Sequence, residues 1–230
     1  RAAMHGEFDV VAVSSVAYPL LADQYWILSV GSSVGRGYGP VLVSKDVLSI
    51  AELAGKRVGV ASKGTTGGTL ARMYCPQGTI FKELPYDRIA EGILRGELDA
   101  GVMIHEELVH YPAMGLRRVE DLGGLWTQRT GLPLPVGLNL VKKSVGREDA
   151  VRIAGACRDS LLWSLEHTQE AMNLVGGMGR SCAAQFVPMF SNADTLCMPR
   201  DVRQSLAVLF DRLSVMGWAP ALSQIEVIDA

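Results

Sequence analysis

The sequence predicts an α/β protein made of two similar lobes that face a central cleft, with a helical C-terminal part. The leading observation is an internal echo: a Gly-Glu-apolar-Asp turn precedes an apolar run at residues 10–13 and again at residues 100–104. Continuous apolar runs of this length are typical of buried strands in parallel sheets. Each run ends in polar residues, Ser14 and His105. Polar groups just past the carboxyl ends of such strands are where α/β folds bind ligands.

Between the two echoes the chain alternates strands and short helices. Residues 57–61 predict a strand, residues 62–68 a small polar loop, and residues 69–74 a short helix. A further helix is expected to start at Asp87, which can cap it, and to end before Gly96. Its apolar face is formed by Ile89, Ile93 and Leu94.

The chain is predicted to be mainly helical from residue 147 onward. It holds two apolar stripes at helical spacing, Ala150, Ile153, Ala154, Cys157, Leu161 and Leu165 in the first, and Val202, Leu206, Leu209, Leu213 and Met216 in the second. Gly176-Gly177 is expected to break a helix between them. Residues 39–44 and 135–141 are predicted to be extended crossover segments that join the lobes.

These elements predict a discontinuous first lobe, residues 1–43 and 133–230, and an inserted second lobe, residues 44–132. This is the plan of the type II periplasmic-binding-protein fold. The chain opens with Arg-Ala-Ala-Met-His-Gly, a pattern typical of the last turn of a helix closed by glycine, and a strand follows at once. We therefore expect a further segment of the first lobe to precede the printed sequence.

Composition argues against several classes of partner. The 230 residues are 48% hydrophobic and 20% charged, as in ordinary globular proteins, and the formal net charge is −2. Without a basic excess, neither nucleic acid nor an anionic membrane surface is expected to bind. The four cysteines are far apart and form no CxxC pair, so no zinc site is expected. A small-molecule substrate is the expected partner, and both a monomer and a homodimer stay open.

The glycine-rich segment 31–40 is the first candidate for contact with a ligand. Its four glycines permit close approach of the backbone to a ligand or unusual dihedral angles, and Ser32 and Gly37 are the expected contacts. No Gly-Lys-Ser/Thr follows, which argues against a nucleotide phosphate loop. The alternative is a hinge loop whose glycines serve only the backbone conformation.

A second candidate lies where the strand 57–61 passes into a helix. The hydroxyl and backbone N–H groups of Thr65, Thr66 and Gly67 can form a seat for a carboxylate or phosphate. The alternative is simple capping of the helix by Thr65 or Thr66. Because capping and anion binding can coexist, the residues alone do not separate the two roles.

The third candidate is His105, at the end of the apolar run 100–104. A histidine there can act as a general base near neutral pH, and the alternative is a structural or surface histidine. Its neighbour Glu106 is expected to point elsewhere, as a cap or a solvated side chain. Ser14, at the end of the matching run, is expected to donate a hydrogen bond to ligand oxygens rather than to act as a nucleophile.

Several stretches resemble the 1,4-dihydroxy-6-naphthoate synthases of the futalosine pathway to menaquinone. They are residues 8–14, 17–18, 22–25, 31–40, 65–66, 104–106, 121–123, 126, 130–131 and 133–137. The resemblance implies a cytoplasmic lyase, without metal or organic cofactor, that converts cyclic dehypoxanthinyl futalosine into 1,4-dihydroxy-6-naphthoate. It also implies that His105 takes a proton from the substrate, while Ser14, Thr65 and Thr66 bind it.

Three positions depart from the pattern of that family. Gly67 stands where a small non-glycine residue is usual, Ser15 where a bulky aromatic is usual, and Val16 where histidine is common. Two other functions therefore stay open. One is a chorismate dehydratase of the same fold and pathway, and the other is a solute-binding protein that shares the fold without catalysis. The Ile-His-Glu setting of His105 favours the synthase.

Overall fold

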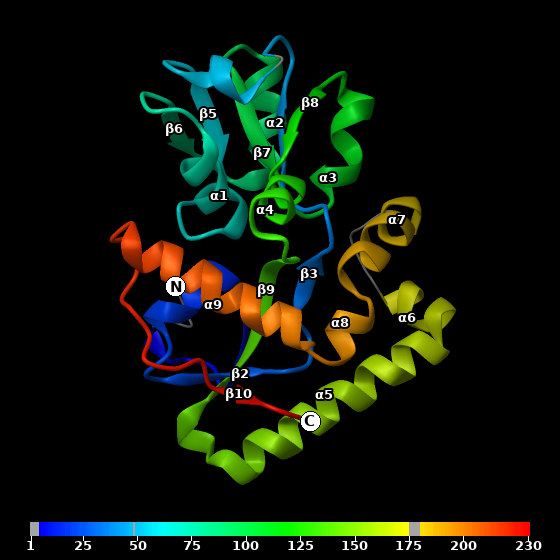
Figure 1. Ribbon diagram of the computed structural model, residues 1–230. Helices are drawn as coiled ribbons and strands as arrows, with labels where there is room; N and C mark the ends of the chain where they lie inside the picture. The colour runs from blue at the N-terminus through cyan, green and yellow to red at the C-terminus, as the bar shows by residue number, and fades with distance from the viewer. Residues whose placement is uncertain (1–4, 48, 175–179) are drawn as a thin grey trace. The chain divides into compact units, whose positions relative to one another are not determined.

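The computed structural model describes residues 5–47, 49–174 and 180–230 of the chain (Figure 1). The chain divides into two compact units, which we describe separately. Unit 1 comprises Arg1–Val34, Pro135–Arg180 and Val187–Ala230, and unit 2 comprises Gly35–Leu134 and Ser181–Phe186. Residues 35–43, which the sequence assigned to the first lobe, thus belong to unit 2. The predicted helix break at Gly176-Gly177 lies outside the described residues.

The sheet of unit 1 is built around its longest strand, β9. The order of strands is β1 (Val10–Ser14), β9 (Leu134–Lys142), β2 (Tyr25–Leu28) and β10 (Val227–Ile228), and β3 (Ser33–Gly35) also pairs with β9. Strands β1 and β2 both run antiparallel to β9, whereas β10 runs parallel to β2. Residues 135–141, predicted to be a crossover, therefore lie within the sheet as β9.

The prediction that residues 10–13 form a buried parallel strand is wrong. Strand β1 pairs antiparallel with β9 and stands at the end of the strand order. Its residues alternate between exposed and half-buried, and Val10 keeps 40% of its surface exposed. An apolar run shows that a strand is favoured, but it does not show the direction of the partner strand.

The predicted helical character of the C-terminal part is confirmed, and apart from residues 181–186 these helices lie in unit 1. They are α5 (Arg147–Glu166), α6 (Thr168–Leu174), α7 (Arg180–Phe190), α8 (Ala193–Leu196) and α9 (Arg200–Val215), and short 3₁₀ turns occupy Ser15–Leu20 and Lys143–Val145. The stripe of α9 is buried from Val202 to Leu213, and Ala150 and Ala154 of α5 pack into the core of the sheet. The last residue of each stripe is not buried, because Leu165 and Met216 are 51% and 43% exposed.

The sheet of unit 2 has the strand order β6-β5-β7-β4-β8. These strands are β4 (Val41–Ser44), β5 (Arg57–Val60), β6 (Ile80–Glu83), β7 (Ala100–Met103) and β8 (Arg117–Asp121). Strand β5 runs parallel to β6 and β7, as predicted, whereas β4 is antiparallel to β7 and β8. Because β4 is paired on both sides and fully buried, residues 39–44 are part of this core rather than a crossover alone.

Unit 2 contains the two helices that the sequence predicted, near residues 69–74 and 87–95, and two that it did not. They are α1 (Thr66–Tyr74), α2 (Tyr86–Leu94), α3 (Glu107–His110) and α4 (Leu122–Thr130), with 3₁₀ turns at Ile50–Leu53 and Tyr111–Met114. Helix α2 is capped by Pro85, so Asp87 lies in the first turn and is not the cap. Ile89 and Ile93 are buried against Leu98 and Met103 in the core. Gly96 has φ +74°, as expected for a glycine that closes a helix.

Candidate functional site

In the segment 35–40, each glycine is required for a different structural reason. A Cβ on Gly35 would lie 1.9 Å from the carbonyl oxygen of Tyr38, so the turn has no space for a side chain there. Gly37 has φ +80° and open space around it, so its glycine serves the backbone conformation. A Cβ on Gly39 would lie 3.0 Å from the Cα of Gly123. Whether Gly37 also touches substrate, as the sequence predicted, stays a prediction.

The start of helix α4 holds this segment in place. The N–H of Leu122 donates to the carbonyl oxygen of Pro40 at 2.9 Å. Asp121 caps the helix, and its carboxylate accepts from the N–H groups of Gly123 and Gly124 at 3.0 and 2.9 Å. Burial raises the pKa of Asp121, and those two hydrogen bonds oppose the shift. A Cβ on Gly123 would lie 2.2 Å from the Tyr38 carbonyl oxygen, so this contact requires glycine.

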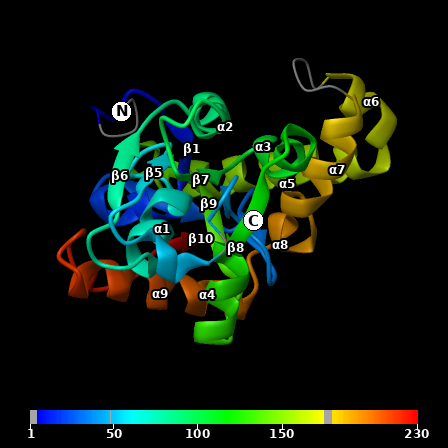
Figure 2. The ribbon, with the colours of Figure 1, turned by 90° about the horizontal axis from the view of Figure 1, so that it is seen from above.

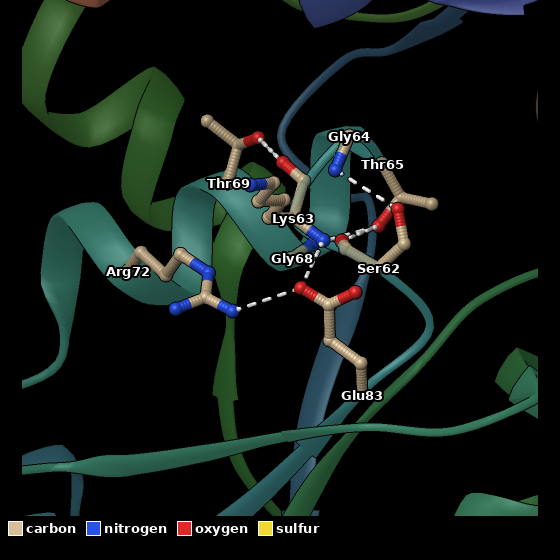
Figure 3. A network of polar contacts seen from close by, with 8 residues as sticks. All are labelled: Ser62, Lys63, Gly64, Thr65, Gly68, Thr69, Arg72 and Glu83. Atoms are coloured by element: carbon tan, nitrogen blue, oxygen red, sulfur yellow. Dashed lines mark hydrogen bonds and ion pairs between the residues drawn. The ribbon is translucent and has the colours of Figure 1, made fainter. Parts of the chain in front are cut away.

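The turn that leads into α1 is held by its own side chains (Figure 3). Ser62 Oγ accepts from the N–H of Gly64 at 2.9 Å. Thr65 Oγ1 donates to the Ser62 carbonyl oxygen at 2.8 Å and accepts from the N–H of Gly68 at 3.2 Å. Thr65 is therefore the N-cap of α1, and its hydroxyl is used within the turn.

A second layer of hydrogen bonds surrounds the same turn (Figure 3). The hydroxyl of Thr69 donates to the Lys63 carbonyl oxygen at 3.0 Å. The Lys63 N–H donates to Glu83 Oε1 at 3.2 Å, and Arg72 lies 3.4 Å from the same carboxylate oxygen. The carboxylate of Glu83 thus connects the end of β6 to the turn. These bonds fix the direction in which α1 begins.

Thr66 and Gly67 occupy the first two positions of α1. Backbone N–H groups in the first turn of a helix have no carbonyl partner within the helix, and they attract anions. Thr66 is only 2% exposed. A Cβ on Gly67 would lie 3.0 Å from Pro40 Cβ and 3.1 Å from Ile104 Cγ2. This glycine therefore permits close packing, and the packing places the start of α1 beside the residue that precedes His105.

His105 has a strained backbone immediately after β7. Its φ is +53°, and it is the only non-glycine residue in the described part of the chain with positive φ. Such conformations cost free energy and are concentrated at functional sites. The imidazole is exposed and packs against the ring of Tyr86, with ring centroids 4.9 Å apart and planes at 57°. The carbonyl oxygen of His105 accepts from the N–H of Leu108 at 3.1 Å.

Glu106 makes a side-chain contact that the sequence did not predict. It precedes α3 as the N-cap residue but makes no side-chain cap bond. Instead, Glu106 Oε1 accepts from the Tyr86 hydroxyl at 3.2 Å. Burial, followed by the charge of Glu106, raises the pKa of Tyr86, so the phenol is a neutral donor near pH 7. Sequence reasoning missed Tyr86, since no pattern connects it to a residue nineteen positions later.

Unit 1 contributes serine hydroxyls around Gly137 of β9. Ser14, the last residue of β1, lies directly opposite Gly137 in the strand register. A Cβ on Gly137 would lie 3.7 Å from Ser33 Cβ, so Ser33 borders the same glycine. Ser15 and Ser32 are fully buried, and their hydroxyls have no hydrogen-bond partner among the described residues. Buried hydroxyls without partners are uncommon and call for an explanation.

The predicted site residues fall into two groups. Unit 2 holds Gly37, Thr65, Thr66, Gly67 and His105, and unit 1 holds Ser14 and Ser32. Within unit 2, the contacts of Gly67 with Pro40 and Ile104 bring the glycine-rich segment, the start of α1 and the end of β7 together. The described residues include no cluster of three or more His, Cys, Asp or Glu suited to a metal ion. No helix among them is sufficiently long and apolar to cross a membrane.

Comparison with known proteins identifies the family. The model of the family described as "Menaquinone biosynthesis" matches residues 1–214. The chain belongs to this family. One relative, the 1,4-dihydroxy-6-naphthoate synthase of Thermus thermophilus, is 34% identical over 223 residues, which is 95% of this chain and 81% of the relative. The synthase of Streptomyces coelicolor is 30% identical over 236 residues, covering 96% and 80%.

Solved structures confirm the predicted fold class of this menaquinone biosynthesis family member. A protein from Archaeoglobus fulgidus matches with a TM-score of 0.87 and 37% identity, covering 94% of this chain and 82% of that one. The alkanesulfonate-binding protein of Xanthomonas axonopodis pv. citri, bound to MOPS, matches with a TM-score of 0.73 and 14% identity, covering 100% and 83%. The second likeness shows the periplasmic-binding-protein-like fold alone.

Proposed function

We propose that this family member is a lyase that converts cyclic dehypoxanthinyl futalosine into 1,4-dihydroxy-6-naphthoate, with His105 as the general base. The observation that carries the proposal is the strained, exposed His105 at the end of β7, next to the start of α1. The names of the Thermus and Streptomyces relatives support the product. As a step in menaquinone biosynthesis, the reaction belongs in the cytoplasm and requires no metal or organic cofactor.

In this proposal the imidazole of His105 takes a proton from the substrate. The electron pair left behind drives the elimination that detaches the sugar-derived part and leaves the naphthoate. Tyr86 packs against the imidazole, and its hydroxyl is in turn held by Glu106. A base that is held in one orientation needs no reorganisation before proton transfer. The positive φ of His105 costs free energy, and in this proposal that strain is what places the imidazole for proton transfer.

The start of α1 supplies a seat for an anionic or hydroxyl group of the same substrate. Thr65 shapes the turn, and the backbone at the start of α1, around Thr66 and Gly67, is proposed to bind this group. Gly37 keeps the neighbouring backbone free of a side chain. From unit 1, Ser14 and Ser32 are proposed to donate hydrogen bonds to substrate oxygens, since the Ser32 hydroxyl has no partner among the described residues.

The test compares His105→Asn with His110→Asn, the same change at an exposed histidine five residues later. Naphthoate formed from cyclic dehypoxanthinyl futalosine is measured by mass spectrometry, and the melting temperature is measured on the same samples. Loss of a general base lowers turnover by about 10²–10⁴-fold, and we expect this for His105→Asn alone with folding retained. Turnover within about threefold of the parent, well below that range, would exclude His105 as the base.

One observation supports a second candidate function. The fold likeness to an alkanesulfonate-binding protein fits a chain that binds a small molecule without transforming it. A chorismate dehydratase is the alternative within the pathway. The same mass measurement separates them, because a binding protein leaves cyclic dehypoxanthinyl futalosine intact, and a dehydratase consumes chorismate instead.

A further inference from the structure

Unit 1 contains a cavity of about 530 Å³ that no step of the proposed reaction has used. Its floor comes from the sheet and the approach to β3, at Gly31, Ser33 and Asn139, and its wall from α5, at Ala156 and Leu161, with Phe190 beside it. The volume falls within the range of small-molecule sites. Helix α8 packs against α5 next to these residues (Figure 2). All of the described lining residues belong to unit 1, so we treat the cavity as a property of that unit.

The floor presents a carboxamide with unused hydrogen-bonding capacity. Asn139 is half-buried, and its carboxamide forms no hydrogen bond with any residue that the structure describes. A Cβ on Gly31 would lie 1.9 Å from Asn139 Nδ2, so a glycine at this position makes room for the carboxamide. The hydroxyl of Ser33 is likewise without a partner among the described residues. The Asn139 carboxamide and the Ser33 hydroxyl therefore offer uncharged hydrogen-bond donors and acceptors at the cavity floor.

This floor continues to a residue already predicted to bind substrate. Side chains two positions apart in a strand share one face, so Asn139 and Gly137 lie on the same face of β9. Directly paired residues of antiparallel strands also share a face, which places Ser14 there too, opposite Gly137. Ser33 borders Gly137 on this same face, so Ser14, Ser33 and Asn139 all lie around one glycine.

The residues of the cavity wall indicate which kind of ligand the cavity can bind. Ala156, Leu161 and Phe190 present apolar surface, and no charged side chain occurs among the described lining residues. A flat apolar wall over an uncharged polar floor suits fused aromatic rings that carry a hydroxyl or carbonyl oxygen. A carboxylate would find no cation there.

We infer that this cavity is the subsite for the fused rings that become the naphthoate, with a ring oxygen bound by Asn139 and Ser33. The inference rests on the proposed function, because that function supplies the substrate. It assigns recognition of the ring system to unit 1, and Ala156 and Asn139 become residues that determine specificity.

The test measures binding of 1,4-dihydroxy-6-naphthoate to the full chain by calorimetry without oxygen. Asn139→Leu removes the polar floor, and Ala156→Leu fills the cavity from an exposed position of α5 that tolerates leucine. Each is expected to raise the Kd about tenfold, the equivalent of one or two lost hydrogen bonds. Ala207→Leu, at an exposed alanine of α9 outside the cavity, is the matched control and should keep the parent Kd.

The outcomes separate this inference from the proposed function. Naphthoate formation by the parent chain tests the function, whereas the Kd of the variants tests the cavity. If the parent forms naphthoate but both variants bind it with the Kd of the control, the subsite assignment is overturned and the function stands. A second measurement detects misfolded variants. Asn139→Leu and Ala156→Leu should raise the KM for cyclic dehypoxanthinyl futalosine by a similar factor, with kcat and melting temperature unchanged.

Discussion

The turn 62–68 of unit 2 and two buried serines of unit 1, Ser15 and Ser32, differ in how their polar groups are hydrogen-bonded. In the turn 62–68, the hydroxyls of Ser62, Thr65 and Thr69 all hydrogen-bond to nearby backbone. In unit 1, the buried hydroxyls of Ser15 and Ser32 have no partner among the described residues. Polar groups of the first kind build a shape, whereas those of the second kind carry a desolvation cost that a ligand can relieve.

The comparison changes how a glycine-rich or threonine-rich segment should be interpreted. Thr65 occurs in a segment that resembles a ligand seat, yet its hydroxyl is already committed to Ser62 and Gly68. In the proposed function, unit 2, which looks most like a binding motif in sequence, supplies the shape of the turn and the base, His105. The unbonded hydroxyls of Ser15 and Ser32 lie in unit 1, in a segment with no such motif.

The rigidity of the unit 2 turn can be tested by adding a methyl group where the turn has no space for one. In Gly68→Ala the new Cβ would lie 2.1 Å from the Ser62 carbonyl oxygen, a backbone atom that cannot move aside without opening the turn. We expect the free energy of unfolding in urea to fall by about 1–3 kcal/mol, as for other overpacked sites. Gly64→Ala is the matched control, because its nearest neighbour would be Ser62 Oγ at 3.5 Å. Equal stability of the two variants would show that the turn is not rigid.

A second change tests whether the aromatic contact orients His105. Tyr86→Leu removes the ring that packs on the imidazole, and Tyr86→Phe removes only the hydroxyl bound by Glu106. Aromatic pairs contribute about 0.5–1.5 kcal/mol, so kcat should fall by up to about tenfold in the leucine variant and less in the phenylalanine variant. KM should stay constant in both. A rise in KM with unchanged kcat would assign Tyr86 to substrate binding instead.

Local patterns predicted the elements of this fold better than their pairing. Helices α5 and α9 were predictable because their apolar stripes repeat within a few residues of sequence. Strand β1 was assigned to a parallel sheet because an apolar run carries no information about its partner. Segments 39–44 and 135–141 look extended in sequence, but only partners more than fifty residues away make them the strands β4 and β9.

In the candidate site too, the sequence predicted individual residues but not their contacts with distant residues. Position at a strand end was sufficient to single out His105 and Ser14, and their roles stay predictions. The contact between Tyr86 and His105, and the space that Gly31 leaves for Asn139, depend on residues that the fold brings together from distant positions. The departure at Gly67 has a physical reason that the sequence alone could not provide, namely its close packing on Pro40 and Ile104.

Two alanine variants, one in each unit, test the contrast between the units. Thr65→Ala removes the N-cap of α1, so the free energy of unfolding should fall by about 1 kcal/mol. Ser32→Ala removes a buried hydroxyl without a partner, so stability should be unchanged or rise slightly, while KM for cyclic dehypoxanthinyl futalosine rises about three- to tenfold through a lost hydrogen bond. Urea unfolding and initial rates on both variants provide the four values. If Ser32→Ala is destabilised as much as Thr65→Ala, the Ser32 hydroxyl is bonded within the folded protein in solution. The serines of unit 1 would then build shape, as the turn of unit 2 does, and the contrast between the units would be lost.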